Sequence, residues 1–285
     1  MNDKNSTNPL DSKKKATDII TLRDLLAEQH VFRIPDYQRG YAWHNEFIVL
    51  WQDILRLYRT GNRKHYTGML ALEEITSDSI KEAEAIPGTT AFYVVDGQQR
   101  ITSLVIILNS LITYIKDELP NQDMSLYDNL LIVNDVIYRF GYSCKRQDGA
   151  TQFFENRIFK NNIGLSHADK YLSNINFAKE FIDKELNRVS GDTALEILNS
   201  VLDRMVFNLY FVTDDFDVRV TFETINNRGK RLSNLELLKN RLMYLSTFFP
   251  AGNAYGLQLI SKINTAWQSI YKNLCFGDEQ LPDDD

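Results

Sequence analysis

Residues 91–108 read AFYVVDGQQRITSLVIIL, and their character changes twice within a few positions. Ala91 to Val95 is short, apolar and rich in β-prone side chains, which is typical of a buried strand. Ile101 to Ile115 is strongly apolar and long enough for a buried helix. Between the two stands the polar sequence Asp96-Gly97-Gln98-Gln99-Arg100. The sequence therefore predicts a strand that turns sharply into a helix, within a fold of the α+β class.

This polar turn has the features of an anion site. A helix that starts directly after a strand exposes unpaired N–H groups at its positive end, and Gly97 permits a close approach or a positive φ. Arg100 and Thr102 fall in the first helical turn, where the oxygens of a bound anion would lie. Three roles are open to Asp96, which can cap the helix, hold a Mg²⁺ ion or orient Arg100. The plainer alternative is an Asp cap beside solvated Gln and Arg side chains. The turn is not a P-loop, because no Gly-Lys-Ser/Thr sequence ends it.

Similar patterns predict the elements around this turn. They are a short helix capped by Thr17 or Thr21, a strand over 31–34 closed by Pro35, a helix capped by Asn45 and reaching Tyr58, strands over 66–73 and 206–212, and a helix capped by Ser233 and reaching Leu245. The expected organisation is a flexible leader (1–16), a core (17–120 and 201–245), a helical insertion (121–200) and a C-terminal helical segment (246–285) leading to an effector region outside this sequence.

The composition is that of a soluble globular protein, with 44% apolar and 25% charged residues in 285. No apolar run approaches the roughly 20 residues that a membrane helix needs, and the polar N-terminus has no apolar signal core. Cys144 and Cys275 lie far apart and show no metal-binding spacing. These features predict a cytoplasmic protein without disulfides and without a membrane partner.

The charge is distributed unevenly along the chain. The net charge is −6, yet residues 31–66 hold six Lys and Arg against three Asp and Glu, and residues 221–245 hold five against two. An acidic chain with local basic segments favours a discrete anion site over an extended DNA track.

A second polar group lies in IPDYQRGYAW, residues 34–43. Arg39 offers a planar fork suited to phosphate or carboxylate, and Trp43 or a neighbouring tyrosine can stack on a base. Gln38 is the other long polar side chain among these aromatics. The alternative is that the aromatics pack in the core while Arg39 pairs with Asp36 on the surface.

A third polar group lies in FETINNRGKRLS, residues 222–233. Asn226 tolerates a left-handed backbone and can bond base edges, and Arg228 adds positive charge. Glu223 is a candidate in this segment for activating water or binding a metal. The alternative is an Asn-Gly turn followed by a Ser233 helix cap.

In this order, the three segments resemble the N-terminal domain of the GmrSD-type, modification-dependent restriction endonucleases, over about residues 18–245. The family pattern is I-P-x-Y-Q-R-x-Y-x-W, then D-G-Q-Q-R-[IL]-T-x-L, then F-x-x-[IL]-N-x-x-G-x-x-L-[ST], and Tyr66-Thr67-Gly68 matches a weaker strand pattern between the first two. The resemblance implies a ParB/sulfiredoxin-like fold, a small mixed sheet with flanking helices. It also implies a site that binds and hydrolyses a nucleoside triphosphate with a divalent cation, Mg²⁺.

The resemblance and the residue chemistry together give two groups of site residues. The catalytic candidates are Asp96, Gln99, Arg100 and Glu223, with Asp96 also the candidate metal ligand. The nucleotide-binding candidates are Gln38, Arg39, Trp43, Gly97, Gln98, Arg100, Thr102, Asn226 and Arg228. The family commonly controls an HNH-type nuclease, and no His-rich nuclease pattern occurs here, so DNA cleavage is expected to need a separate domain or partner.

Two other functions stay open at this point. The local basic segments fit a DNA-binding or nuclease module of the ParB-like superfamily. The helical middle region and the acidic end fit a noncatalytic protein-interaction domain. Homo-oligomerisation is a further expectation that the sequence leaves open.

Overall fold

A computed structural model describes residues 18–35, 38–61, 63–75, 89–133, 135, 137–142, 149–162, 170–212, 234–246, and parts of 258–270. Its centre is a six-stranded sheet with the order β1-β8-β3-β4-β2-β7. The strands of this sheet are β1 (Asp18–Thr21), β2 (His30–Ile34), β3 (His65–Glu74), β4 (Thr90–Asp96), β7 (Phe140–Tyr142) and β8 (Met205–Phe211). A separate two-stranded sheet pairs β5 (Ile132–Val133) with β6 (Ile137–Tyr138).

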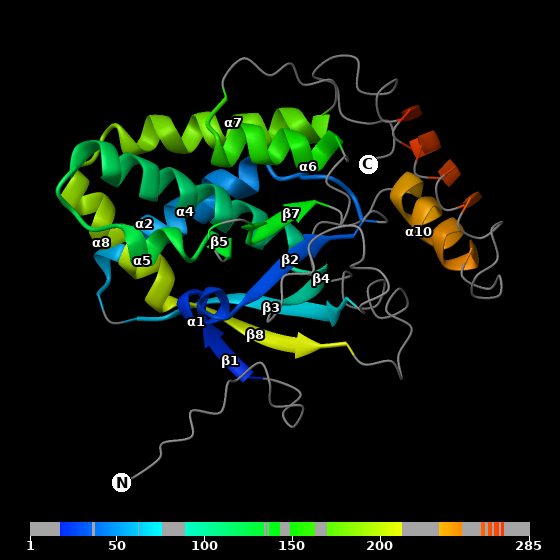
Figure 1. The fold of residues 1–285 in the computed structure, drawn as a ribbon, viewed down its shortest axis with the longest axis horizontal. Coiled ribbons are helices and arrows are strands. Elements are labelled where there is room, and N and C mark those ends of the chain that lie inside the picture. The colour runs from blue at the N-terminus through cyan, green and yellow to red at the C-terminus, as the bar shows by residue number, and fades with distance from the viewer. Residues whose placement is uncertain are drawn as a thin grey trace, which may run out of the picture.

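Helices stack on one face of the main sheet (Figure 1). The described helices are α1 (Leu22–Ala27), α2 (Asn45–Arg59), α4 (Gln98–Glu118), α5 (Ser125–Asp128), α6 (Gly149–Phe154), the π-helix η1 (Glu155–Phe159), α7 (Lys170–Leu186), α8 (Gly191–Arg204) and α10 (Asn234–Ser246). Helix α4 packs against both α7 and α8, and α2 packs against α8. The α+β class is therefore confirmed, whereas the ParB/sulfiredoxin-like assignment stays a prediction.

The main sheet is mixed. Strand β8 runs parallel to β3 and antiparallel to β1, β3 runs antiparallel to β4, and β2 runs parallel to both β4 and β7. Phe32 and Phe92 on one face join the main core with the helices, while Val31 and Ala91 on the other face meet the β5–β6 hairpin. Burial on both faces explains why Ala91 to Val95 of β4 is an uninterrupted apolar run.

Several local expectations agree with the structure. Thr21 is the N-cap of α1 and forms a capping box with Asp24: its hydroxyl accepts from the Asp24 amide at 3.1 Å, and the Asp24 carboxylate accepts from the Thr21 amide at 3.3 Å. The helix predicted to be capped by Asn45 is present, but the cap prediction is wrong: His44 is the N-cap and Asn45 is the first helical residue.

The region 121–200, predicted as a helical insertion, contains strands as well as helices among its described residues. Helices α7 and α8 fit that description, but residues 132–142 form β5, β6 and β7, and β7 extends the main sheet at the edge of β2. Helix α4 also packs directly on α7 and α8. The proposed division into domains stays a prediction.

No helix in the described part of the chain combines the length and apolar character that a membrane span requires.

Candidate nucleotide site

Gly97 makes the sharp change from β4 to α4. It is the N-cap of α4 with φ 92° and ψ 7°, in the left-handed region that favours glycine. A Cβ at this position would lie 3.0 Å from Leu70 Cδ1 and 3.1 Å from the Met69 carbonyl oxygen. The turn thus needs glycine for its backbone angle and its close approach to β3. Since Gly97 is the cap residue, Asp96 does not occupy the N-cap position, one of the three roles open to it.

Arg100 links the start of α4 to β3. Its Nη1 donates to the Thr67 carbonyl oxygen at 2.8 Å, and its Nη2 donates to the Met69 carbonyl oxygen at 2.8 Å and to Asp96 Oδ2 at 3.4 Å. The guanidinium lies over Gly68, where a Cβ would be 1.9 Å from Nη1 and where φ is +106°. The side chain predicted to contact phosphate is therefore already fixed by backbone carbonyls, with one carboxylate beside it.

Two glutamines hold the first motif against the second. Gln38 Nε2 donates to the carbonyl oxygens of Val94 and Val95 at 2.9 and 2.7 Å. Gln99 Oε1 accepts from the Ala42 amide at 2.8 Å, and Gln99 Nε2 donates to the Gly40 carbonyl at 3.0 Å. The expected meeting of these motifs is present, but both ends of the Gln99 amide bond backbone. Gln99 thus positions the loop from Gln38 to Trp43.

Gln98 and Thr102 are buried in the first turns of α4. The Thr102 hydroxyl donates to the Gln98 carbonyl at 2.7 Å, within the helix. The side-chain oxygens of Gln38 and Gln98 are buried and accept no hydrogen bond from the described residues. Such orphan acceptors are costly unless a donor reaches them. They mark the junction of the two motifs as a place where a further donor group would be stabilised.

Asp96 lies in a setting that disfavours its charge. Burial raises the pKa of its carboxyl group, while the Arg100 charge and the Gly97 backbone N–H act in the opposite direction. Its side chain is 16% exposed. No group of three or more His, Cys, Asp or Glu arranged to hold a metal occurs among the described residues. A Mg²⁺ ion at Asp96 would need ligands from a bound phosphate and water, as Mg²⁺ often does.

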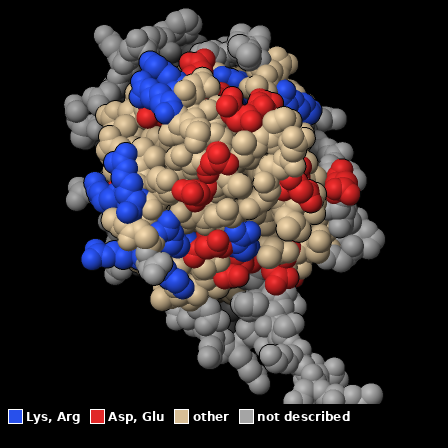
Figure 2. Space-filling view, turned by 90° about the vertical axis from the view of Figure 1, so that its left-hand side faces the viewer, with Lys and Arg blue, Asp and Glu red and all other residues tan. Residues whose placement is uncertain are grey.

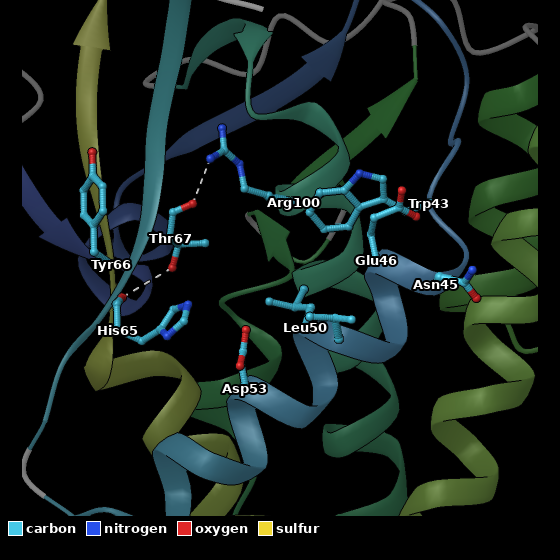
Figure 3. A pocket seen from close by; sticks show the side chains of 10 residues that line it. Trp43, Asn45, Glu46, Leu50, Asp53, His65, Tyr66, Thr67 and Arg100 are labelled. Carbon is cyan, nitrogen blue, oxygen red and sulfur yellow. Dashed lines mark hydrogen bonds between the residues drawn. The ribbon is translucent and has the colours of Figure 1, made fainter. Parts of the chain in front are cut away.

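A cavity of about 400 Å³ lies beside this junction (Figure 3). Its walls come from the loop before α2, from α2, from the start of β3 and from α4. The lining residues are Trp43, Asn45, Glu46, Val49, Leu50, Asp53, His65, Tyr66, Thr67 and Arg100. Figure 3 shows Trp43 and Arg100 toward one end of the cavity and Asp53 toward the other.

The cavity brings together only part of the predicted site. Trp43 and Arg100 line it, whereas Gln38, Gln98, Gln99 and Thr102 are buried and do not line it, and neither do Asp96 and Gly97. Arg39 is half-buried and is not part of the cavity lining. The third motif, with Glu223, Asn226 and Arg228, lies outside the described residues.

Sequence reasoning missed Glu46 and Asp53. Both lie on α2, where they resemble ordinary solvated positions of an amphipathic helix. A usable signal was their spacing of seven residues, which returns a side chain to the same helix face after about two turns. Thr67 and Tyr66 belong to the Tyr66-Thr67-Gly68 segment, which the family pattern had marked.

The chain was compared with known families and with curated proteins. The family model described as GmrSD restriction endonuclease, N-terminal domain, matches residues 22–243. No curated protein matches the chain. The match spans most of the sequence and contains the two motifs that meet at the cavity. The chain therefore belongs to the family of the GmrSD restriction endonuclease N-terminal domain, which implies a role in a restriction system for modified DNA.

Proposed function

We propose that the domain binds a nucleoside triphosphate in the cavity between Trp43 and Arg100, and that it hydrolyses this nucleotide to regulate DNA restriction. The observation that carries the proposal is that a tryptophan from the first motif and an arginine from the second face one cavity of about 400 Å³. That volume falls in the usual range for small-molecule sites, roughly 300–1,000 Å³.

The side chains that line the cavity suit the different parts of a nucleotide. An indole ring offers a face on which a base stacks, and a guanidinium is a strong donor to phosphate oxygens. Glu46 and Asp53, on α2, are acceptors suited to sugar hydroxyls or base amino groups. Because carboxylates repel phosphate, the phosphates belong near Arg100 and away from Asp53.

Arg100 keeps capacity for a phosphate despite its present bonds. A guanidinium has five N–H donors, and the bonds described above involve Nη1 and Nη2 but not Nε. Each charge-assisted hydrogen bond to a phosphate is worth about 1.5–3 kcal/mol. Prior bonding to Thr67 and Met69 also preorganises the side chain, which lowers the entropy cost of binding.

Hydrolysis would draw on a carboxylate and a metal ion. Asp96 is the described candidate, because it is paired with Arg100, which lines the cavity, and because burial raises the pKa of its carboxyl group. The same group can contribute one ligand to Mg²⁺ while the phosphates and water complete the shell. Gln99 acts as a positioning residue, since its amide is bonded to Gly40 and Ala42.

Tryptophan fluorescence offers a direct test. Trp51 and Trp267 are buried, whereas Trp43 is partly exposed and lines the cavity. Titration with ATP, GTP, CTP and UTP in the presence of Mg²⁺ should change the emission of Trp43. Trp43→Phe should abolish most of this change, and Arg100→Gln should weaken binding at least tenfold.

Arg100→Gln removes structural bonds as well, so its melting temperature must be measured alongside. Arg100→Lys keeps the charge and supplies a second comparison. The proposal fails if none of the four nucleotides binds, or if a folded Arg100→Gln variant binds as tightly as the parent chain.

A further inference from the structure

The end of α2 and its connection to β3 carry a dense group of exposed cations. Arg56, Arg59, Arg63 and Lys64 are all exposed and lie within nine residues of sequence. Figure 2 shows Lys and Arg side chains gathered along one edge of the face that it presents. On a chain of net charge −6, such a concentration of positive charge points to an anionic partner.

Little acidic charge compensates these cations. Arg56 donates to Asp53 at 3.0 Å, which accounts for one of the four. Within the described part of the chain, Arg59, Arg63 and Lys64 form no ion pair. Glu196 is a nearby carboxylate, and it accepts from the Tyr58 hydroxyl at 2.9 Å. We call Arg59, Arg63 and Lys64 the basic tip.

An exposed aromatic residue lies directly beyond the basic tip. Tyr66, on β3, is 58% exposed although it is large and largely apolar. Tyrosine hydroxyls, arginines and lysines are the side chains that commonly bond DNA phosphates. The next residue, Thr67, lines the cavity together with His65 and Tyr66 itself. Tyr66 therefore lines the cavity and follows the basic tip closely in sequence.

We propose that the basic tip and Tyr66 form a surface that binds the phosphate backbone of duplex DNA. Three cations and one phenol form a small contact, enough to position a duplex without reading its sequence. Two of the three cations are arginines, whose planar fork fits phosphate oxygens in a bidentate manner.

An anionic membrane is the competing partner for such a charge cluster. Membrane-surface binding by a basic segment relies on an apolar face that inserts between the headgroups. The large hydrophobic side chains exposed along α2 and at the start of β3 are Val49 and Tyr66. These two do not make such a face, so the charge pattern favours DNA.

Salt dependence gives the expected magnitude. Each phosphate contact contributes a slope of about −0.9 to the plot of log binding constant against log salt concentration. If each residue of the basic tip contacts one phosphate, neutralising all three lowers the magnitude of the slope by about 3. The loss should be similar for duplexes of different sequence, because backbone contacts carry no base information.

The experiment compares two triple variants of the 285-residue chain. The test variant is Arg59→Gln/Arg63→Gln/Lys64→Gln, and the control is Lys160→Gln/Lys184→Gln/Arg188→Gln. Both remove three positive charges from exposed positions, so both change the net charge equally. Binding of a fluorescein-labelled duplex is measured by anisotropy over a series of salt concentrations, without nucleotide. Melting curves confirm that each variant is folded.

We expect the test variant to bind the duplex more weakly than the parent and to show a smaller slope of log binding constant against log salt concentration. The control should keep the parental affinity and slope. Equal slopes in the parent and the test variant would overturn the proposal, as would an equal loss in the control. Binding of the parent to phosphatidylserine vesicles but not to the duplex would also overturn it. Failure here leaves the nucleotide proposal untouched, because that proposal concerns Trp43 and Arg100 and has a fluorescence readout of its own.

Discussion

Replacement of Gly68 by alanine tests how strongly Arg100 holds α4 to β3. Gly68 has φ +106°, and an added Cβ would lie 1.9 Å from Arg100 Nη1. The backbone angle alone costs a non-glycine residue about 1–2 kcal/mol. The Arg100 side chain can move away, but it then loses charge-assisted hydrogen bonds, each worth about 1.5–3 kcal/mol. Loss of one such bond plus the strain gives a destabilisation of about 2.5–5 kcal/mol.

Gly61 provides a matched control for this substitution. It also has a positive φ, +71°, but an added Cβ there would meet no atom within 4 Å. Gly61→Ala should therefore cost only the backbone strain, about 1–2 kcal/mol. Urea unfolding followed by circular dichroism measures both free energies. In the double variant Gly68→Ala/Arg100→Ala the clash is absent, so the two single costs should add to more than the double cost.

The reasoning about Arg100 is refuted if Gly68→Ala and Gly61→Ala lose the same stability. Strict additivity of Gly68→Ala with Arg100→Ala would refute it too, because the clash would then contribute nothing. Either result would mean that Arg100 is free to leave β3 at no cost.

Three further substitutions probe the same framework. Asp96→Asn should stabilise the fold at neutral pH, because burial raises the pKa of the Asp96 carboxyl in the folded state, so that its ionisation above that pKa disfavours the folded state. Below the ordinary carboxyl pKa, Asp96 is protonated in both the folded and the unfolded chain, and the advantage of asparagine should vanish. Urea unfolding at a series of pH values measures this difference. Gln99→Leu leaves the Gly40 carbonyl and the Ala42 amide without the Gln99 side chain and should speed amide hydrogen exchange in residues 38–43. The control Gln52→Leu changes an exposed glutamine and should leave this exchange unchanged. Unchanged exchange in Gln99→Leu would contradict the positioning role of Gln99. Arg139 is 2% exposed, donates to the carbonyls of Glu28, Asn129, Leu130 and His30, and has its pKa lowered to about 10 by burial. Arg139→Met should therefore lower the free energy of unfolding by about 3 kcal/mol or more. A loss below about 1 kcal/mol would show that these carbonyls find other donors.

The elements that sequence predicted well are those with a strong local signal. The sequence Val94-Val95-Asp96-Gly97 predicts a buried strand followed by a turn at Gly97, and Gly97 has the positive φ that glycine allows. The Thr21 cap of α1 rests on a pattern of four residues, and α2 on a clear helical period of apolar side chains. In each case the information lies within one or two turns of chain, where propensity and pattern act.

The short strands could not be predicted in the same way. Strands β5 and β6 have two residues each and β7 has three, so none is long enough to show an alternating pattern. Strand β7 exists because Phe140 and Tyr142 find places beside β2 in the sheet and in the main core. A tertiary contact, rather than local preference, decides such segments.

The candidate site was likewise predictable in part: the sequence predicted which motifs meet, but not what each side chain does there. The meeting of the first two motifs was predicted, and Gln38 and Gln99 do join them. Their individual roles were not predictable, because a glutamine that bonds backbone has the same sequence signature as one that awaits a ligand. The acidic wall of the cavity, Glu46 and Asp53, arises only when α2 packs near the start of β3.

The order of strands in the sheet also affects folding during synthesis on the ribosome. Strand β8 lies between β1 and β3, pairing Asp18 with Leu209 and Leu70 with the same residue. During synthesis, β1 and β3 leave the ribosome long before their shared neighbour. Until residues 205–211 emerge, both strands present unpaired edges on which chaperones or other nascent chains can act. Pairing of β8 with β1 and β3 is therefore a late, long-range event, and slow translation between β3 and β8 should prolong the stage at which these edges are unpaired.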